Sequence, residues 1–251
     1  MSGREALCVP ENRRPLARSS NIPLYAANLV LNGVRALVIG GGEVALRKTR
    51  SLLESRARVT VISPEFHAAF GGLKRANGLQ LVRRAFKPAD LKHARLVFAA
   101  THDPVLNSRI ARAAIKKGLL VNVAAPPEAG NFHVPASIHR GRLSIAISTG
   151  GASAAVARSL REEIEKTVGD EWGDLASLLD ERRATLLAEM NDAEARHGLL
   201  CELGSAKWAR RVKERGAKHA AREMDEVIRA ATKNGASRRT GMSAQQKRVR
   251  R

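Results

Sequence analysis

The sequence predicts an α/β protein whose first half is a Rossmann-type parallel sheet. Three observations support this prediction: short apolar runs alternate with helical segments, the runs carry few polar residues, and a triple glycine follows the first of them. Continuous apolar strands separated by helices are typical of a parallel sheet that is covered on both faces. Aromatic residues make up only 3% of the 251 residues, so we expect a core of Ala, Val, Leu and Ile.

The first predicted strand–helix–strand unit has the usual length of roughly thirty residues. An apolar strand at 34–39 stops at three glycines, a helix follows over 43–56, and a second strand at 58–62 ends before Ser63 and Pro64. The other elements expected in this half are strands at 79–85, 96–100 and 119–123, and a helix over 105–117 capped by Gly118.

The second half of the chain is expected to be mainly helical. Apolar residues alternate over 142–148, which predicts one further strand, and a glycine-rich turn then opens a helix. From 154 to about 229 the sequence favours helix almost throughout, with breaks near 169–173 and Gly204.

The glycine turn matches a dinucleotide-binding fingerprint. Residues 40–45 fit G-x-G-x-x-A, in which Gly40 makes the tight turn, Gly42 lets the backbone approach a pyrophosphate, and Ala45 allows close packing of helix on strand. The amino end of the following helix then offers free N–H groups to the phosphates. A purely structural turn is the alternative, but the strand before and the helix after favour binding.

The choice between NAD and NADP stays open from these residues alone. The fingerprint expects an acid at the end of the second strand to hold the ribose hydroxyls. Glu65 lies two residues late for this role, and Ser63 is an equal candidate. Arg47 and Lys48 in the first helix are candidates for an additional phosphate.

Charge and cysteine content limit the other possibilities. The formal net charge is +20, and residues 207–251 carry fifteen Lys or Arg against four acids. We interpret this stretch as a solvated extension, with polyanion binding as the alternative; without an aromatic platform, a nucleic-acid partner is not expected. Cys8 and Cys201 have no metal-ligand spacing, so we expect a reducing compartment and no metal site. No signal peptide or membrane span is expected, which indicates the cytoplasm.

Several segments together resemble a known family, the precorrin-2 dehydrogenase/sirohydrochlorin ferrochelatase module of siroheme synthases. The similarity begins at Ile22-Pro23-Leu24 and extends to about residue 180. Its other segments are VIGGGEVALRKTRSLLE at 38–54, VTVISPEF at 59–66, AATHDPVLN at 99–107 and NFHVPASIHRGRLSIAISTGGASAAVARSLREEIE at 131–165.

The resemblance implies a fold plan and an activity. The activity is NAD-dependent oxidation of precorrin-2 to sirohydrochlorin, followed by ferrous iron insertion that gives siroheme, in a homodimer. The plan is a flexible arm at 1–20, an NAD-binding Rossmann domain at 21–125, a small α+β dimerisation segment at 126–153, a helical tetrapyrrole-binding domain at 154–232, and a basic disordered tail at 233–251. The residues expected to bind NAD are Gly40, Gly42, Glu43, Val44, Ser63, Pro64, Glu65 and Thr101.

Further candidates follow from position. Asp103 and Asn107 lie with Thr101 after the fourth expected strand, at the carboxyl edge of the sheet where ligands bind. Because the substrate is rich in carboxylates, Arg140, Arg142 and Arg158 are candidates for holding it.

The sequence departs from the family at one position. An aspartate regarded as central to catalysis is replaced by Ala125, which can neither accept a proton nor bind iron. Three explanations stay open. His133 or Glu128 substitutes as the catalytic base, with His133 the better candidate because imidazole titrates near neutrality and binds ferrous iron. Alternatively, positioning alone supports oxidation while water takes the proton, or one activity is lost, which leaves a tetrapyrrole-binding carrier.

Overall fold

The computed structural model describes residues 24–73 and 75–248, with side chains as far as Lys233. Two compact units are formed. The described part of the first ends at Val134 and also includes Gly150–Ser153, and the second comprises Pro135–Thr149 and the residues from Ala154 onward. The arm expected at 1–20 lies outside the described residues.

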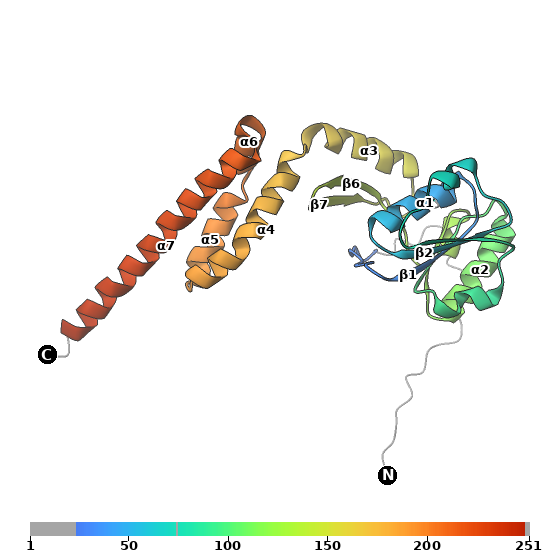
Figure 1. Ribbon diagram of the computed structural model, residues 1–251, viewed down its shortest axis with the longest axis horizontal. Coiled ribbons are helices and arrows are strands. Elements are labelled where there is room, and N and C mark those ends of the chain that lie inside the picture. The colour runs from blue at the N-terminus through green and yellow to red at the C-terminus, as the bar shows by residue number, and fades with distance from the viewer. Residues whose placement is uncertain (1–23, 74, 249–251) are drawn as a thin grey trace, which may run out of the picture. The chain divides into compact units, whose positions relative to one another are not determined.

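The first unit is a five-stranded parallel sheet in the order β3-β2-β1-β4-β5 (Figure 1). This order confirms the predicted Rossmann-type sheet, and it places the switch of winding direction between β1 and β4, where ligands bind in such sheets. The strands are β1 (Arg35–Ile39), β2 (Arg58–Ser63), β3 (Leu79–Arg83), β4 (Leu96–Ala99) and β5 (Leu120–Val123).

Both faces of the sheet are buried, as the continuous apolar strands predict. One face packs against α1 (Glu43–Glu54) and the other against α2 (Pro104–Lys116), so successive residues of β1 belong to different cores. Val38 lies in the α1 core, and Leu37 and Ile39 lie in the α2 core. Short 3-10 turns complete the unit: η1 (Ala68–Leu73), η2 (Pro88–His93) and η3 (Pro127–Ala129).

The second unit begins with an antiparallel hairpin of β6 (Ala136–Arg140) and β7 (Leu143–Ile147). The β7 strand was predicted, whereas β6 was not, because only Ala136 and Ile138 mark its inner face. Gly141, with φ of 53°, makes the turn. Helix α3 (Ala154–Thr167) packs on the hairpin through a small core of Ile138, Ile147 and Ala157.

Four helices complete the second unit: α4 (Glu171–Glu189), α5 (Ala193–Leu203), α6 (Ala206–Arg215) and α7 (Ala217–Arg248). Breaks fall before α4 and at Gly204, as predicted, and also at Asp192, whose carboxylate caps α5. Helix α7 continues to Arg248, whereas we expected a tail without regular structure from residue 233. Its Ala, Arg, Lys and Gln residues favour helix strongly enough to outweigh two isolated glycines.

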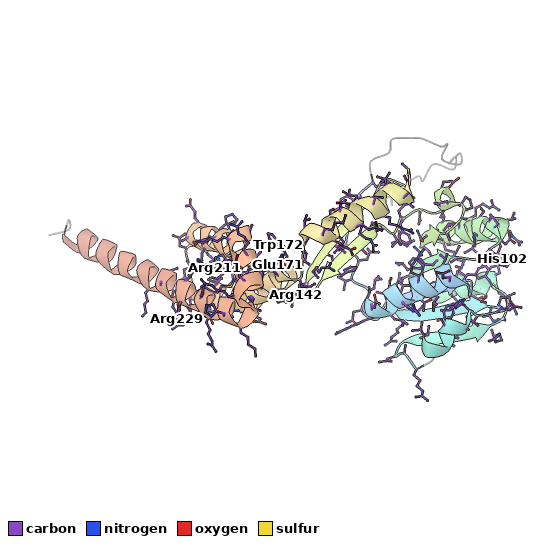
Figure 2. The ribbon with its side chains drawn as sticks, turned by 90° about the horizontal axis from the view of Figure 1, so that it is seen from above. His102, Arg142, Glu171, Trp172, Arg211 and Arg229 are labelled. Atoms are coloured by element: carbon purple, nitrogen blue, oxygen red, sulfur yellow. The ribbon has the colours of Figure 1, made fainter. Side chains whose placement is uncertain are left out.

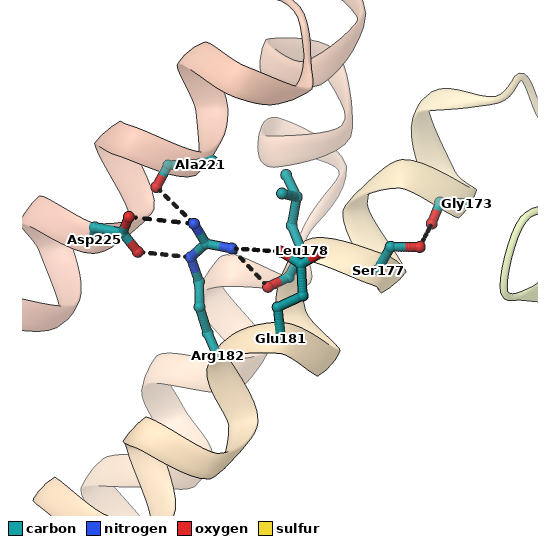
Figure 3. Close-up of polar contacts among 7 residues, drawn as sticks. All are labelled: Gly173, Ser177, Leu178, Glu181, Arg182, Ala221 and Asp225. Atoms are coloured by element: carbon teal, nitrogen blue, oxygen red, sulfur yellow. Dashed lines mark hydrogen bonds and ion pairs between the residues drawn. The ribbon is translucent and has the colours of Figure 1, made fainter.

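An arginine links α4 to α7 (Figure 3). Arg182 donates from Nε to one carboxylate oxygen of Asp225 at 2.7 Å and from a terminal nitrogen to the other at 3.2 Å. It also donates to the backbone carbonyls of Ala221 and Leu178. The Arg182 side chain is only 13% exposed and that of Asp225 is 47% exposed, so the pair is partly buried and links the two helices.

Candidate functional site

The glycine turn has the geometry that the fingerprint requires. Gly40 has φ of 121°, and a Cβ at this position would collide with the carbonyl of Ala100 in the loop after β4. A Cβ on Gly42 would meet nothing within 4 Å, so the space beside Gly42 is open. Ala45 is fully buried against the sheet. The roles assigned to these three positions therefore agree with the packing.

The middle glycine is constrained as well, which the fingerprint did not predict. A Cβ on Gly41 would collide with the carbonyl of Glu65 and lie 2.8 Å from Ser63 Oγ. The backbone N–H of His67 donates to the carbonyl of Gly41 at 2.8 Å. The segment after β2 thus packs directly on the glycine turn, and only glycine fits between them.

The amino end of α1 suits an anionic ligand. Gly42 is the N-cap and contributes no side-chain bond, so the first backbone N–H groups, including those of Glu43 and Val44, have no side-chain cap. Both of these residues are solvent-exposed. The open space at Gly42, the free N–H groups and the positive end of the helix dipole together fit a pyrophosphate.

The end of β2 presents a hydroxyl beside this turn. Ser63 is 7% exposed, and its Oγ makes no hydrogen bond within the described residues. Pro64 and Glu65 follow and are exposed. The Oγ is not among the buried atoms that lack a hydrogen-bond partner, so it is accessible at the surface beside the phosphate turn, where it can bind a ligand.

The neighbouring strand contributes an arginine that sequence reasoning missed. Arg83 ends β3 and pairs in register with Ser63. Its guanidinium lies over the ring of Phe66, 5.5 Å from the centroid, and it forms no ion pair with any described residue. Only the strand order brings Arg83 to the end of β2. The candidates for this role from the sequence, Arg47 and Lys48, lie on α1 instead.

Lys48 is turned into the α1 core. Its Nζ lies 5.8 Å from the centroid of the Phe98 ring. Burial, assisted by the charge of Arg47, lowers the pKa of Lys48 from 10.5 to about 8. Its ammonium group therefore lies against an aromatic ring, and we do not assign it to the phosphate turn.

A buried amide joins the loops that follow β4 and β5. Asn107 is fully buried, and its Oδ1 accepts from Thr101 Oγ1 at 2.8 Å and from the Thr101 backbone N–H at 3.1 Å. Its Nδ2 donates to the carbonyls of Thr101 and Ala125. Thr101 and Ala125 are thereby held together at the carboxyl edge of the sheet.

The other residues of the β4 loop have simpler roles. The Asp103 carboxylate caps α2 by accepting from the N–H groups of Val105 and Leu106 at 2.8 and 3.1 Å. His102 is exposed, and Figure 2 shows it at the surface of the first unit. Asp103 is therefore engaged in helix capping, and nothing directs His102 into the site.

The two candidate bases differ in how firmly they are held. Glu128 is exposed on the short turn η3. His133 is half-buried and follows Phe132, whose carbonyl accepts from Asn122 and whose ring packs edge-on against Phe98. The His133 ring also lies against Gly151, with Cε1 3.5 Å from where a Cβ would stand. Of the two candidates, His133 is thus the more firmly held side chain.

The three candidate arginines for a carboxylate-rich ligand all lie in the second unit. Arg140 pairs with Asp170 at 3.2 Å and Arg142, labelled in Figure 2, pairs with Asp180 at 2.7 Å. Arg158 on α3 is exposed and has no ion pair among the described residues. Its charge is the one of the three that is available to an external carboxylate.

Among residues 24–73 and 75–248, no three His, Cys, Asp or Glu side chains are grouped in a way that could hold a metal ion. In the same residues, no helix combines the length and the apolar character that crossing a bilayer requires.

Comparison with known proteins agrees with this geometry. Residues 27–136 match a family model described as putative NAD(P)-binding, and residues 140–167 match one described as sirohaem biosynthesis protein central. The siroheme synthase of Pseudomonas entomophila is 38% identical over 168 residues, which are 67% of this chain and 36% of that protein. The siroheme synthase of Thioalkalivibrio sulfidiphilus is 39% identical over 160 residues, 64% of this chain and 33% of that protein.

The chain therefore spans about a third of the length of these curated relatives. A solved structure described as SirC, precorrin-2 dehydrogenase, superposes with a TM-score of 0.67 at 28% identity, covering 81% of this chain and all of that one. The sheet order and the glycine turn define a Rossmann-type NAD(P)-binding protein. Residues 27–136 and 140–167 are thus similar to the NAD(P)-binding and central parts of sirohaem biosynthesis proteins, and the chain is similar to part of the siroheme synthases and to a precorrin-2 dehydrogenase.

Proposed function

We propose that this protein is an NAD-dependent dehydrogenase that oxidises precorrin-2 to sirohydrochlorin in siroheme biosynthesis. The observation that carries the proposal is the glycine turn at the amino end of α1, with open space at Gly42 and an unpaired Ser63 hydroxyl beside it. The similarity to siroheme synthases and to a precorrin-2 dehydrogenase supplies the substrate class. We place the reaction in the cytoplasm, in keeping with the two widely spaced cysteines.

The chain's own residues bind and orient the reactants in this proposal. A bound nicotinamide dinucleotide supplies the hydride acceptor. The N–H groups of Glu43 and Val44 hold its pyrophosphate, and Ser63, Pro64 and Glu65 hold the adenosine ribose. Thr101, fixed by Asn107, borders the nicotinamide half of the crevice at the switch point of the sheet.

Proton removal from the macrocycle is assigned to His133. Ala125 has no group that accepts a proton, whereas His133 carries an imidazole on a firmly held backbone. Glu128 is the second candidate, and its exposure on a short turn makes it the weaker one. Of the three arginines of the second unit, Arg158 alone has no acidic partner among the described residues, and we propose it as a group that binds carboxylates.

The test is turnover by the purified full chain, supplied with precorrin-2 and NAD under exclusion of oxygen. Formation of sirohydrochlorin and of NADH in equal amounts is the expected result. His133→Ala is expected to lower the rate by about a hundredfold or more, the usual contribution of a positioned base, and Ala125→Asp to restore activity in that background. Full activity of His133→Ala would contradict the assignment of the base.

The same assay extended with ferrous iron tests the second reaction that the family resemblance implies. Siroheme formation by the wild type, lost in His133→Ala, would assign iron insertion to this chain with His133 as the responsible group. Formation of sirohydrochlorin alone would limit the activity to dehydrogenation.

A carrier function is the second candidate, and Ala125 is the observation that favours it. In this alternative the protein binds the tetrapyrrole and passes it to a partner without oxidising it. Tight binding of precorrin-2 with no NADH formed would support the carrier and reject the dehydrogenase.

We also propose that the protein is a homodimer formed through the β6–β7 hairpin and α3. A two-stranded sheet with a buried core of three residues is marginal by itself. Val156 and Leu160, one helical turn apart on α3, are 57% and 48% exposed. Leu160→Glu is expected to yield a monomer in light scattering, and Leu187→Glu, at an exposed leucine on α4, serves as the control.

A further inference from the structure

A feature that the proposed function uses only in part lies at the ends of β2 and β3. Three side chains gather there: the Ser63 hydroxyl, the Phe66 ring and the Arg83 guanidinium. None of them is needed to bind a pyrophosphate. The feature depends on the proposed dinucleotide site at the glycine turn, because it lies where the second strand meets that turn.

The Ser63 hydroxyl has no partner within the protein. Ser63 as a residue is 7% exposed, but its Oγ is not among the buried atoms that lack a partner, so the oxygen is accessible. It has no hydrogen bond among the described residues and stands 2.8 Å from where a Cβ of Gly41 would be. The hydroxyl therefore lies beside the glycine turn and can donate to a bound group.

Arg83 is the register partner of Ser63 on the neighbouring strand, and its guanidinium has a defined position. It lies over the Phe66 ring at 5.5 Å, a contact that orients the planar group without using its N–H donors on an acid. The adjacent Arg84 is not available, because it donates to both oxygens of Asp90 at 2.7 and 2.8 Å. These bonds lower the pKa of the Asp90 carboxyl, and Arg84 is paired with that carboxylate.

In Rossmann sheets the end of β2 meets the ribose of the adenosine half, where an acid selects the free 2′-hydroxyl and an arginine accepts a 2′-phosphate. This chain carries both kinds of group. Glu65 is exposed and forms no ion pair with Arg83 or with any other described residue. The Glu65 carboxylate and the Arg83 guanidinium therefore do not neutralise each other.

We infer that the site accepts NADP as well as NAD, with the 2′-phosphate held between Ser63 Oγ and the Arg83 guanidinium. The phosphate gains the hydroxyl as a donor and a planar cation that presents several N–H groups. Glu65 serves the free 2′-hydroxyl when NAD is bound.

Calorimetry on the purified full chain tests the inference, with NAD, NADP and adenosine 2′,5′-bisphosphate as probes. Arg83→Gln is expected to weaken NADP and the bisphosphate by about tenfold, the value of one charge-assisted hydrogen bond, and to leave NAD within about twofold. Ser63→Ala is expected to weaken NADP by about fivefold. Arg58→Gln, which removes the same charge at the opposite end of β2, is the control.

The inference stands if Arg83→Gln lowers the ratio of NADP to NAD affinity by at least about fivefold while Arg58→Gln leaves it unchanged. A smaller change, or an equal loss of both dinucleotides, overturns it. Because Arg83 is exposed, the variant is expected to fold, and circular dichroism checks this. Failure of the wild type to bind either dinucleotide would instead reject the proposed function.

Discussion

Asn107 Nδ2 donates to the carbonyl of Ala125 at 3.0 Å and thereby ties the loop after β4 to the loop after β5. The same side chain makes three hydrogen bonds with Thr101, so all its donors and acceptors are used in one fully buried position. The position of Ala125, where the family has its aspartate, thus depends on an amide that lies eighteen residues earlier.

Asn107→Ala is expected to cost about 2–4 kcal/mol in the free energy of unfolding, because it leaves several buried backbone groups unpaired. Turnover is expected to fall further than dinucleotide affinity, since the loops and not the glycine turn lose their support. Urea unfolding and turnover measure the two effects. Asn131→Ala is the control, because Asn131 also bonds two backbone groups, at Leu119 and Val121; equal loss of turnover in both variants would refute a specific role for Asn107.

Substitutions of Gly41 and Gly42 are expected to act on different properties, the first on stability and the second on NAD affinity. Gly41→Ala is expected to destabilise the protein by about 2 kcal/mol or more, since its Cβ would collide with the Glu65 backbone. Gly42→Ala has room and a φ of −80°, so the expected loss is below about 1 kcal/mol. Its Cβ would nevertheless occupy the space proposed for the pyrophosphate, so NAD affinity is expected to fall by at least about tenfold. Thermal unfolding measures the loss of stability, and calorimetry measures the NAD affinity. Unchanged NAD affinity of Gly42→Ala would argue against the proposed pyrophosphate site at the glycine turn.

Because the pKa of Lys48 is lowered by burial, we expect the free energy of unfolding to depend on pH. Its pKa is about 8 in the folded protein and 10.5 without burial, so between these values the unfolded chain binds the proton that the folded one has lost. The contribution of Lys48 to the free energy of unfolding therefore rises from pH 8 to 10.5, by about 1.4 kcal/mol per unit of pKa difference. Lys48→Met is expected to exceed the wild type in stability below pH 8, and the difference shrinks toward pH 10.5.

Urea unfolding across this range measures the Lys48 effect, and Lys116→Met, at an exposed lysine of α2, is the control. A difference between Lys48→Met and the wild type that stays constant with pH would show that the lysine is not desolvated by the Phe98 core.

Arg182→Met is expected to lower the stability of the helical unit by about 1–3 kcal/mol, because it removes the bonds to Asp225 and to two carbonyls. The neighbouring Arg183 is exposed and forms no ion pair among the described residues, so Arg183→Met is expected to stay within about 0.5 kcal/mol. Chemical unfolding followed by Trp172 and Trp208 fluorescence compares them, and equal effects would reject the α4–α7 link as a stabilising contact.

The sequence predicted the parts of the fold that depend on local patterns. Apolar runs mark β1, β2, β4 and β5, and the role of Gly40 and Gly42 follows from the residues around them. The helical breaks at Gly204 and before α4 were predicted because glycine disfavours helix, although Gly173 and Gly198 lie inside α4 and α5.

What sequence reasoning missed depends on neighbours that are distant in the chain. Arg83 reaches Ser63 only because β3 lies beside β2 at the edge of the sheet. The constraint on Gly41 comes from the path of residues 63–67, and the four bonds of Asn107 come from two separate loops. Periodicity and motif spacing carry no information about such contacts.

The chain leaves the first unit after Val134 and re-enters it at Gly150–Ser153, before α3 begins. A continuous fragment therefore cannot contain all of the first unit without also carrying the hairpin. Truncation at Val134 would remove Gly151 from beside the His133 ring. The hairpin is an insertion connected at both ends to the neighbourhood of the proposed base, so insertions or deletions within residues 135–149 are expected to change catalysis as well as assembly.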